Sequence, residues 1–309
     1  MYFVKQMTLP QQITKTRIAP TPSGFLHLGN ALSFALTAGI ATQKNAKILL
    51  RIDDLDQKRI EQKYVQDIFD TLHFLEIPWH QGPQNYHEYK STYSQTHRLH
   101  HYNKALQQLK ESGTIYACDC SRTKIAAGNP TGSYPGTCRN KNLPLGNNNV
   151  NWRIRTNEIK QLTVKTINGE NITTTLPPEM HDFVVRKKDG FPAYQLASLI
   201  DDQHFGIDMI VRGEDLWPST LAQLYLADVL QQGTFKNTIF YHHPLLLASG
   251  EKKLSKSAGD TSIQFLRNAG KTRKDIYSMI AQMLSIQTPV SDFISLSNAV
   301  RVDAAKPNS

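Results

Sequence analysis

Cysteine is scarce in this sequence. The 309 residues include only three, Cys118, Cys120 and Cys138, and all of them lie in one short segment. An odd number of neighbouring cysteines cannot pair completely and cannot staple distant loops. The pattern therefore favours a reducing compartment and a metal site over a disulfide framework.

Long apolar stretches are also missing. The longest runs from about residue 31 to residue 41, which is too short to cross a bilayer. Residues 1–15 lack the continuous apolar core of a signal peptide. We therefore expect a cytoplasmic protein with no membrane partner.

The charge that is present is mostly positive. Lys and Arg number 35 against 26 Asp and Glu, a net charge of +9. Such an excess suits a polyanionic partner, nucleic acid first, although many basic proteins bind none. Twelve Phe and twelve Tyr supply apolar material for a core, and the length allows two ordinary domains, one of which could be inserted in the other.

Strand and helix patterns alternate in the first and last thirds of the chain, which predicts an α/β fold with a parallel sheet. The expected strands are 16–19, 47–52 and 209–211, and the expected helices are 28–43, 62–75, 102–109, 191–200 and 220–230. Between them, 150–155, 162–167 and 171–176 predict small β-structure in a region that looks inserted. From residue 240 we expect a basic loop and then two or three short helices.

The first predicted helix begins with His27-Leu28-Gly29-Asn30. Gly29 lets a ligand approach the backbone, the helix N-terminus offers N–H groups to an anion, and His27 can donate a hydrogen bond to a phosphate oxygen. Taken alone, the motif is weak and fits a solvent-facing histidine at an ordinary helix start better than a ligand site.

A basic loop, Lys252-Lys253-Leu254-Ser255-Lys256-Ser257, follows Gly250. Its ammonium groups could stabilise charge on a transferring phosphate, although isolated lysine-rich loops are usually solvated surface. Together, Pro-x-Gly-x-Leu-His-x-Gly and Lys-Leu-Ser-Lys-Ser resemble the two signatures of class I aminoacyl-tRNA synthetases. The resemblance implies one ATP site, with His27 and Lys256 as catalytic residues. The implied ATP-binding residues are His27, Gly29, Asn30, Lys253, Ser255 and Lys256.

The segment from Arg17 to Gly24 resembles the opening of glutamyl-tRNA synthetases, which carry arginine where the glutaminyl enzymes do not. A guanidinium pairs both oxygens of a carboxylate, so the resemblance implies glutamate as substrate. A neutral amide would leave the arginine unpaired and be rejected by on the order of 10⁴. The implied glutamate contacts are Arg17, Ala19, Thr21, Asp53, Tyr194 and Arg212.

Asp53 departs from the family pattern Arg-Ile-Glu-Asp-x-Asp, in which the glutamate binds the substrate ammonium. The aspartate keeps the charge but is one methylene shorter. Two other positions have plainer interpretations: Arg212 could form a surface salt bridge with Glu214 or Asp215, and Tyr194 could be an ordinary half-buried tyrosine.

The cysteine segment, Cys118-Asp119-Cys120 followed by Tyr134 and Cys138, resembles the zinc site of glutamyl-Q tRNA(Asp) synthetases, truncated paralogues of the glutamyl enzymes. The resemblance implies one structural Zn²⁺ held by three thiolates and the Tyr134 phenolate. A phenol with a pKa of about 10 needs the charge of the metal to ionise. Three unligated thiols, or a site closed by water or Asp119, are the alternatives.

The segment from Arg212 to Thr220 also resembles the Arg-Gly-x-Asp-Leu-x-x-Ser-Thr pattern of these paralogues. The histidine pairs His100-His101 and His242-His243 have no cysteine or acidic cluster at ligand spacing, so we expect no metal there.

The resemblance implies a Rossmann-type sheet split by a zinc-bearing acceptor subdomain and followed by a small helical subdomain. Only about fifty residues follow Lys256, so we expect no anticodon-binding domain. The expected segments are 1–101 (first Rossmann half), 102–186 (zinc-bearing insertion), 187–240 (second Rossmann half) and 241–309 (helical, stem-contact-like, with the Lys-Leu-Ser-Lys-Ser loop).

In function, the resemblance implies a monomeric ATP-dependent glutamyl ligase. It would activate L-glutamate with ATP and Mg²⁺ without tRNA, then transfer the glutamyl group to the queuosine base in the anticodon of tRNA(Asp). Two alternatives are a reduced glutamyl-tRNA synthetase that charges the tRNA 3′ end and a catalytically silent RNA-binding paralogue.

Overall fold

The computed structural model describes residues 12–129, 133–246 and 262–300. The first unit is strand β1 (Lys15–Ile18), helix α1 (Leu28–Lys44) and strand β2 (Lys47–Leu50). The two strands are parallel, with Lys15 opposite Lys47 and Ile18 opposite Leu50. Asn45 ends α1 in the left-handed conformation, with φ of 52°, which allows the sharp reversal into β2. These elements confirm the predicted strand–helix–strand opening.

The main sheet has the order β6-β5-β9-β8. Its members are β5 (Leu162–Thr166), β6 (Asn171–Thr174), β8 (Met209–Gly213) and β9 (Ile239–His243). β8 pairs in parallel with β9, and helix α7 (Trp217–Val229) connects them. β1 lies beside β8, because the Asp208 N–H donates to the Lys15 carbonyl. We had expected a loop from residue 240, and the buried strand β9 corrects this prediction.

A third, antiparallel sheet has the order β3-β4-β7. It contains β3 (Ile115–Cys118), β4 (Asn151–Ile154) and β7 (Val184–Arg186), and helix α5 (Arg122–Gly128) follows β3. Of the expected insertion 102–186, only this part forms a separate unit; the β5–β6 hairpin extends the main sheet. The segment boundaries proposed from the sequence stay a prediction.

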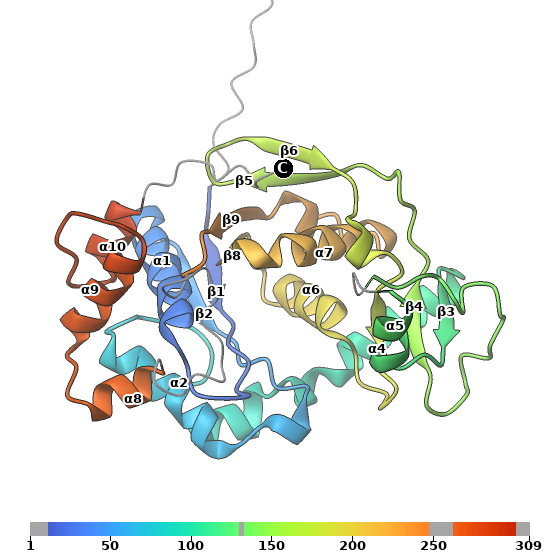
Figure 1. Ribbon diagram of the computed structural model, residues 1–309, viewed down its shortest axis with the longest axis horizontal. Coiled ribbons are helices and arrows are strands. Elements are labelled where there is room, and N and C mark those ends of the chain that lie inside the picture. Colours follow the sequence, from blue (N-terminus) through green and yellow to red (C-terminus); the bar gives the residue numbers. More distant parts are fainter. Residues whose placement is uncertain (1–11, 130–132, 247–261, 301–309) are drawn as a thin grey trace, which may run out of the picture.

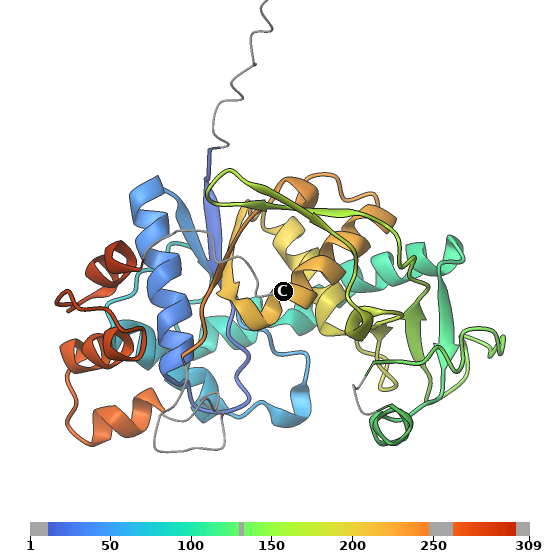
Figure 2. The ribbon, with the colours of Figure 1, turned by 45° about the horizontal axis from the view of Figure 1, so that its top comes forward.

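Helices cover the strands on two sides (Figures 1 and 2). On one side α1 packs against α9 (Arg273–Met283) and α10 (Phe293–Ala299). A Cβ at Gly39 would lie 2.1 Å from the Ser297 Cβ, so this close approach requires glycine. On the other side α6 (Tyr194–His204) packs against α7 and α4 (Leu99–Glu111).

The remaining helices lie at the periphery. They are α2 (Gln62–Phe74), which contacts α8 (Ile263–Asn268), and the single turn α3 (Tyr86–Glu88). Helices α8, α9 and α10 are the short helices predicted near the C-terminal end. Among the described residues, no helix combines the length and apolarity needed to cross a bilayer.

Candidate functional site

A cavity of about 280 Å³ opens where β1 and β8 end and α1 begins. The carboxyl ends of parallel strands are where α/β folds bind ligands. Six of the residues singled out from the sequence line it: Arg17, Ala19, Thr21, Asn30, Tyr194 and Arg212. The fold therefore brings together residues that are far apart in the chain.

The first signature caps helix α1. His27 is the N-cap residue, its Nδ1 accepts the Gly29 N–H at 3.1 Å, and the Asn30 side chain accepts the His27 N–H at 3.1 Å. The Gly29 amide, one of the N–H groups at this helix N-terminus, thus donates to the His27 ring. His27 also forms a β-bridge with Ser262. The chain therefore returns to the first signature directly after 247–261, the range outside the described residues that contains Lys253, Ser255 and Lys256.

Arg212 is a buried cation with an unpaired edge. Its side chain comes from β8, and only 3% of the residue is exposed. Nη1 donates to Thr220 Oγ1 at 3.3 Å and to Gln223 Oε1 at 3.1 Å, whereas Nε and Nη2 have no hydrogen-bond partner among the described residues. Burial, with the Arg17 cation acting in the same direction, lowers the pKa of Arg212 to about 10. The structure does not pair it with Glu214 or Asp215, so the surface salt bridge considered from the sequence is wrong.

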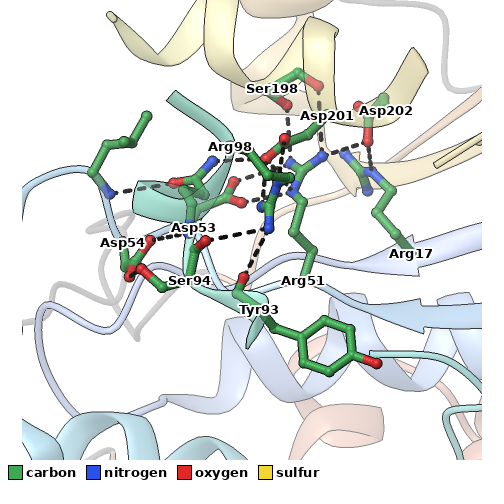
Figure 3. Close-up of polar contacts among 12 residues, drawn as sticks. Arg17, Arg51, Asp53, Asp54, Tyr93, Ser94, Arg98, Ser198, Asp201 and Asp202 are labelled. Atoms are coloured by element: carbon green, nitrogen blue, oxygen red, sulfur yellow. Dashed lines mark hydrogen bonds and ion pairs between the residues drawn. The ribbon is translucent and has the colours of Figure 1, made fainter. Parts of the chain in front are cut away.

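Arg17 and Arg51 differ from Arg212 because they share a resident carboxylate (Figure 3). Asp202 on α6 accepts Arg17 Nε at 3.1 Å and Arg51 Nη1 at 2.6 Å through the same oxygen, Oδ1. All three side chains are buried. Sequence analysis missed Asp202, although adjacent aspartates at the end of an apolar helix are an unusual pattern that could have drawn attention to it.

Asp53, the expected ammonium contact, is held by Arg51 in a bidentate ion pair. Arg51 Nε lies 2.6 Å from Oδ1, and Arg51 Nη2 lies 3.0 Å from Oδ2. Burial raises the pKa of the Asp53 carboxyl, and the Arg51 charge opposes that rise. Ser198 Oγ accepts a further hydrogen bond from Arg51. Asp53 therefore stands in a fixed position with part of its charge already compensated.

Asp201 anchors the segment before α4 to α6. It accepts Arg98 Nε at 2.9 Å and Nη2 at 3.0 Å, and the Tyr102 hydroxyl at 2.7 Å. Burial alone would raise the pKa of Asp201, but the hydrogen bonds from Arg98 and the charges of Arg51 and Arg98 outweigh it, so this pKa lies below its ordinary value. The adjacent aspartates thus fix different parts of the chain: Asp201 fixes α4, and Asp202 fixes the strands of the cavity.

A second cavity, of about 770 Å³, adjoins the first. Thr21 and Tyr194 line both. Tyr194 is 43% exposed, so it is a wall residue of the two cavities, not a half-buried core tyrosine. The larger cavity lies between Asp53 and the cysteine-bearing unit, and its lining includes Cys120, Arg153, Lys187 and Lys188.

The three cysteines converge in a buried cluster. Their Sγ atoms lie within 4.8 Å of one another, and this is the one such group of His, Cys, Asp or Glu in the described part of the chain. The Tyr134 hydroxyl lies 3.5 Å from Cys118 Sγ and accepts the Cys138 N–H at 2.7 Å. Asp119 Oδ1 lies 3.2 Å from Cys138 Sγ. Soft sulfur donors this close together fit a structural metal.

Burial raises the pKa of the Cys120 thiol to about 12, so a thiolate there needs a cation beside it. The His100 and His101 rings lie 3.9 Å apart between centroids and His204 lies 4.5 Å from His101, but in the described part of the chain no histidines form a group of ligand atoms like that of the cysteines. His242 and His243 form hydrogen bonds with separate hydroxyls, of Thr220 and Ser33.

A parallel sheet with a cavity at its strand ends, and a first signature that caps the helix beside it, define the catalytic domain of a class I aminoacyl-tRNA synthetase. The family described as tRNA synthetases class I (E and Q), catalytic domain, matches residues 13–306. The chain belongs to this family.

Two curated relatives illustrate the similarity. A glutamyl-Q tRNA(Asp) synthetase of Prochlorococcus marinus (strain MIT 9313) is 32% identical over 92% of this chain and 88% of its own length. Glutamate–tRNA ligase 2 of Syntrophus aciditrophicus (strain SB) is 32% identical over 83% of this chain. The matched region covers about half (54%) of the length of that relative. The resemblance to glutamyl-Q tRNA(Asp) synthetases is confirmed.

A solved structure has the same fold. The glutamate tRNA ligase of Elizabethkingia meningosepticum superposes with a TM-score of 0.71 at 20% identity, covering 94% of this chain and 65% of that one. At this identity the likeness establishes the fold alone.

Proposed function

We propose that the protein activates L-glutamate with ATP and transfers the glutamyl group to the queuosine base of tRNA(Asp). The observation that supports glutamate activation concerns Arg212, which lines the 280 Å³ cavity. Its Nε and Nη2 have no hydrogen-bond partner among the described residues. A buried guanidinium with two free nitrogens is costly unless a ligand pairs with it. The side-chain carboxylate of glutamate supplies that partner, and the amide of glutamine does not. This proposal moves the side-chain contact from Arg17, where the resemblance placed it, to Arg212, because Asp202 already accepts Arg17 Nε at 3.1 Å.

The other residues that we assign to glutamate line this cavity or the adjoining one. Arg17, Ala19 and Thr21 come from β1 and the turn after it, and Tyr194 begins α6. Asp53 faces the adjoining cavity and is held rigidly by Arg51. In this proposal the substrate lies between Arg212 and Asp53, with its ammonium toward the aspartate.

In the activation step, an oxygen of the substrate α-carboxylate attacks the α-phosphorus of ATP, the bond to the β-phosphate oxygen breaks, and pyrophosphate leaves with Mg²⁺. Lys253, Ser255 and Lys256 bind the phosphates, with Lys256 bearing the developing charge. His27 and the α1 N-terminus stabilise the transition state, and Gly29 and Asn30 complete the ATP site. Positioning and electrostatics carry such chemistry, which agrees with a site rich in arginine, lysine and histidine.

The proposed role of the cysteine cluster is structural. Cys118, Cys120 and Cys138 would hold one Zn²⁺, with the Tyr134 oxygen as fourth donor. A metal there would fix the loop that carries Cys120, which forms a wall of the larger cavity. The donor set supports this assignment, because three thiols and a phenol oxygen gather within a buried site.

The acceptor assignment is supported by the names of the curated relatives and by the cysteine–tyrosine motif. The net charge of +9 suits tRNA, and binding should weaken as salt rises. The competing 3′-end acceptor is tested by periodate oxidation of tRNA. Because the cis-diol of queuosine is also sensitive, queuosine-lacking tRNA serves as the control.

Glutamate-dependent ATP–pyrophosphate exchange without tRNA tests the activation step. We expect exchange with glutamate, none with glutamine, and loss of exchange in Lys256→Ala. An inactive protein that still binds tRNA would instead identify a silent RNA-binding paralogue.

A further inference from the structure

Within the described parts of the chain, the hydrogen-bond partners of Arg212 are neutral groups. Gln223 and Thr220, both buried on α7, accept hydrogen bonds from its Nη1 at 3.1 and 3.3 Å. Since a guanidinium offers only donors, the Gln223 oxygen must face it. None of the ion pairs between described residues involves Arg212, whereas Arg17 and Arg51 are paired with Asp202.

The side chains around Arg212 are themselves held in place by further contacts. Thr220 Oγ1 shares a hydrogen bond of 2.8 Å with His242 Nε2 and donates to the Leu216 carbonyl. The His242 ring is stacked on Phe240, with centroids 6.1 Å apart and planes at 15°. The Arg212 guanidinium lies over the same Phe240 ring, 5.7 Å from its centroid. The guanidinium is therefore placed by a rigid aromatic and hydroxyl frame.

The neutrality of this frame has a consequence for substrate choice. A resident carboxylate at Nη1 would pair with Arg212, and a substrate carboxylate would then gain less by binding. An amide and a hydroxyl fix the orientation of the guanidinium and leave its charge uncompensated. The acidic group that completes the site must then come from the ligand.

We propose that Gln223 and Thr220 are positioning residues that set the preference for an acidic amino acid, by holding Arg212 with neutral oxygens and leaving its Nε and Nη2 edge to the substrate. This inference rests on the proposed activation of glutamate and extends it to two residues that do not themselves line the 280 Å³ cavity. They act through Arg212.

The test compares Gln223→Glu with the wild-type protein in glutamate-dependent pyrophosphate exchange, at varied glutamate and saturating ATP. The new carboxylate supplies an internal partner for Arg212. We expect the KM for glutamate to rise by about 10- to 100-fold, with kcat within about threefold, because one well-formed charge pair is worth about that much in affinity. The selectivity for glutamate over glutamine should fall with it.

Gln282→Glu is the matched control, because it adds the same charge at an exposed position on α9, and its KM should stay at the wild-type value. Thr220→Val removes the second oxygen and should also raise KM, whereas Thr220→Ser keeps the hydroxyl and should restore it. Circular dichroism shows whether Gln223→Glu folds. If it does not fold, the comparison of Thr220→Val with Thr220→Ser still tests the inference.

An unchanged KM in folded Gln223→Glu or Thr220→Val would overturn the inference, as would equal losses in Thr220→Val and Thr220→Ser. Failure of the proposed function looks different. In that case the wild-type protein shows no exchange, and calorimetric glutamate binding replaces KM as the readout. Weakened binding in Gln223→Glu would then support the positioning role without the activity, and a wild-type protein that binds no glutamate would refute both.

Discussion

Arg17 forms a buried ion pair with Asp202, with Nε 3.1 Å from Oδ1, although 185 residues separate them in sequence. The same oxygen accepts Arg51 Nη1 at 2.6 Å. Asp202 therefore joins β1, the end of β2 and helix α6 beneath the cavity. Because Arg17 already has a carboxylate partner, Arg212 is the arginine of the cavity whose charge most needs a ligand.

Replacement of Asp202 by asparagine should strongly destabilise the protein. The change removes the carboxylate partner of buried Arg17 and one of the carboxylates beside Arg51, and breaking a buried ion pair costs about 3–5 kcal/mol. Urea unfolding measures the change in the free energy of unfolding. Glu61→Gln breaks the exposed pair with Lys63 and should leave the unfolding midpoint in place. A wild-type midpoint in Asp202→Asn would contradict the assigned role.

Arg212→Met should separate stability from activity. The variant removes a buried charge that has no ion-pair partner among the described residues, so the free energy of unfolding should hold or increase. Glutamate activation should fall by about 10²- to 10³-fold in kcat/KM, because a buried charged hydrogen bond is lost. Thermal unfolding measures the stability of the variant, and pyrophosphate exchange on the same preparation measures its kcat/KM. A stable variant with unimpaired exchange would remove Arg212 from the site.

Protein purified without chelator should contain one zinc per chain by elemental analysis. Cys118→Ser should lose it, because two thiols and a phenol do not hold Zn²⁺ as tightly as the full set. Tyr134→Phe tests the fourth ligand and should weaken retention against a competing chelator. A metal content near zero that Cys118→Ser does not alter would remove the zinc assignment.

His242 should make the fold sensitive to acid. Burial, reinforced by the Arg212 cation, lowers the pKa of His242 to about 3. An unfolded histidine titrates near 6.5, so between these values the unfolded state binds a proton that the native state does not. The free energy of unfolding should therefore fall as pH drops below 6.5, by at most about 1.4 kcal/mol per pH unit from this group.

His242→Gln should reduce that acid sensitivity, measured by urea unfolding between pH 7 and pH 4.5. The exposed His87→Gln serves as the control and should keep the wild-type slope. Identical slopes in all three proteins would show that His242 is not held neutral.

Local motifs made much of the site predictable. Arg17, Ala19 and Thr21 lie within one short segment, and the turn chemistry around Gly29 marks the start of α1. The buried network was not predictable in the same way, because Asp202 acquires its role from Arg17 and Arg51, which reach it only in the folded chain. Strand β9 was missed because its polar histidines are satisfied by long-range partners such as Ser33. The four-residue β3 was too short to show a period.

The central claim is that the glutamyl group is transferred to the queuosine base of tRNA(Asp). One labelling experiment tests this claim most directly. Purified protein is incubated with ATP, labelled glutamate and tRNA from strains with and without queuosine. The account predicts label in tRNA(Asp) only when queuosine is present. Equal labelling of both tRNA preparations would contradict it.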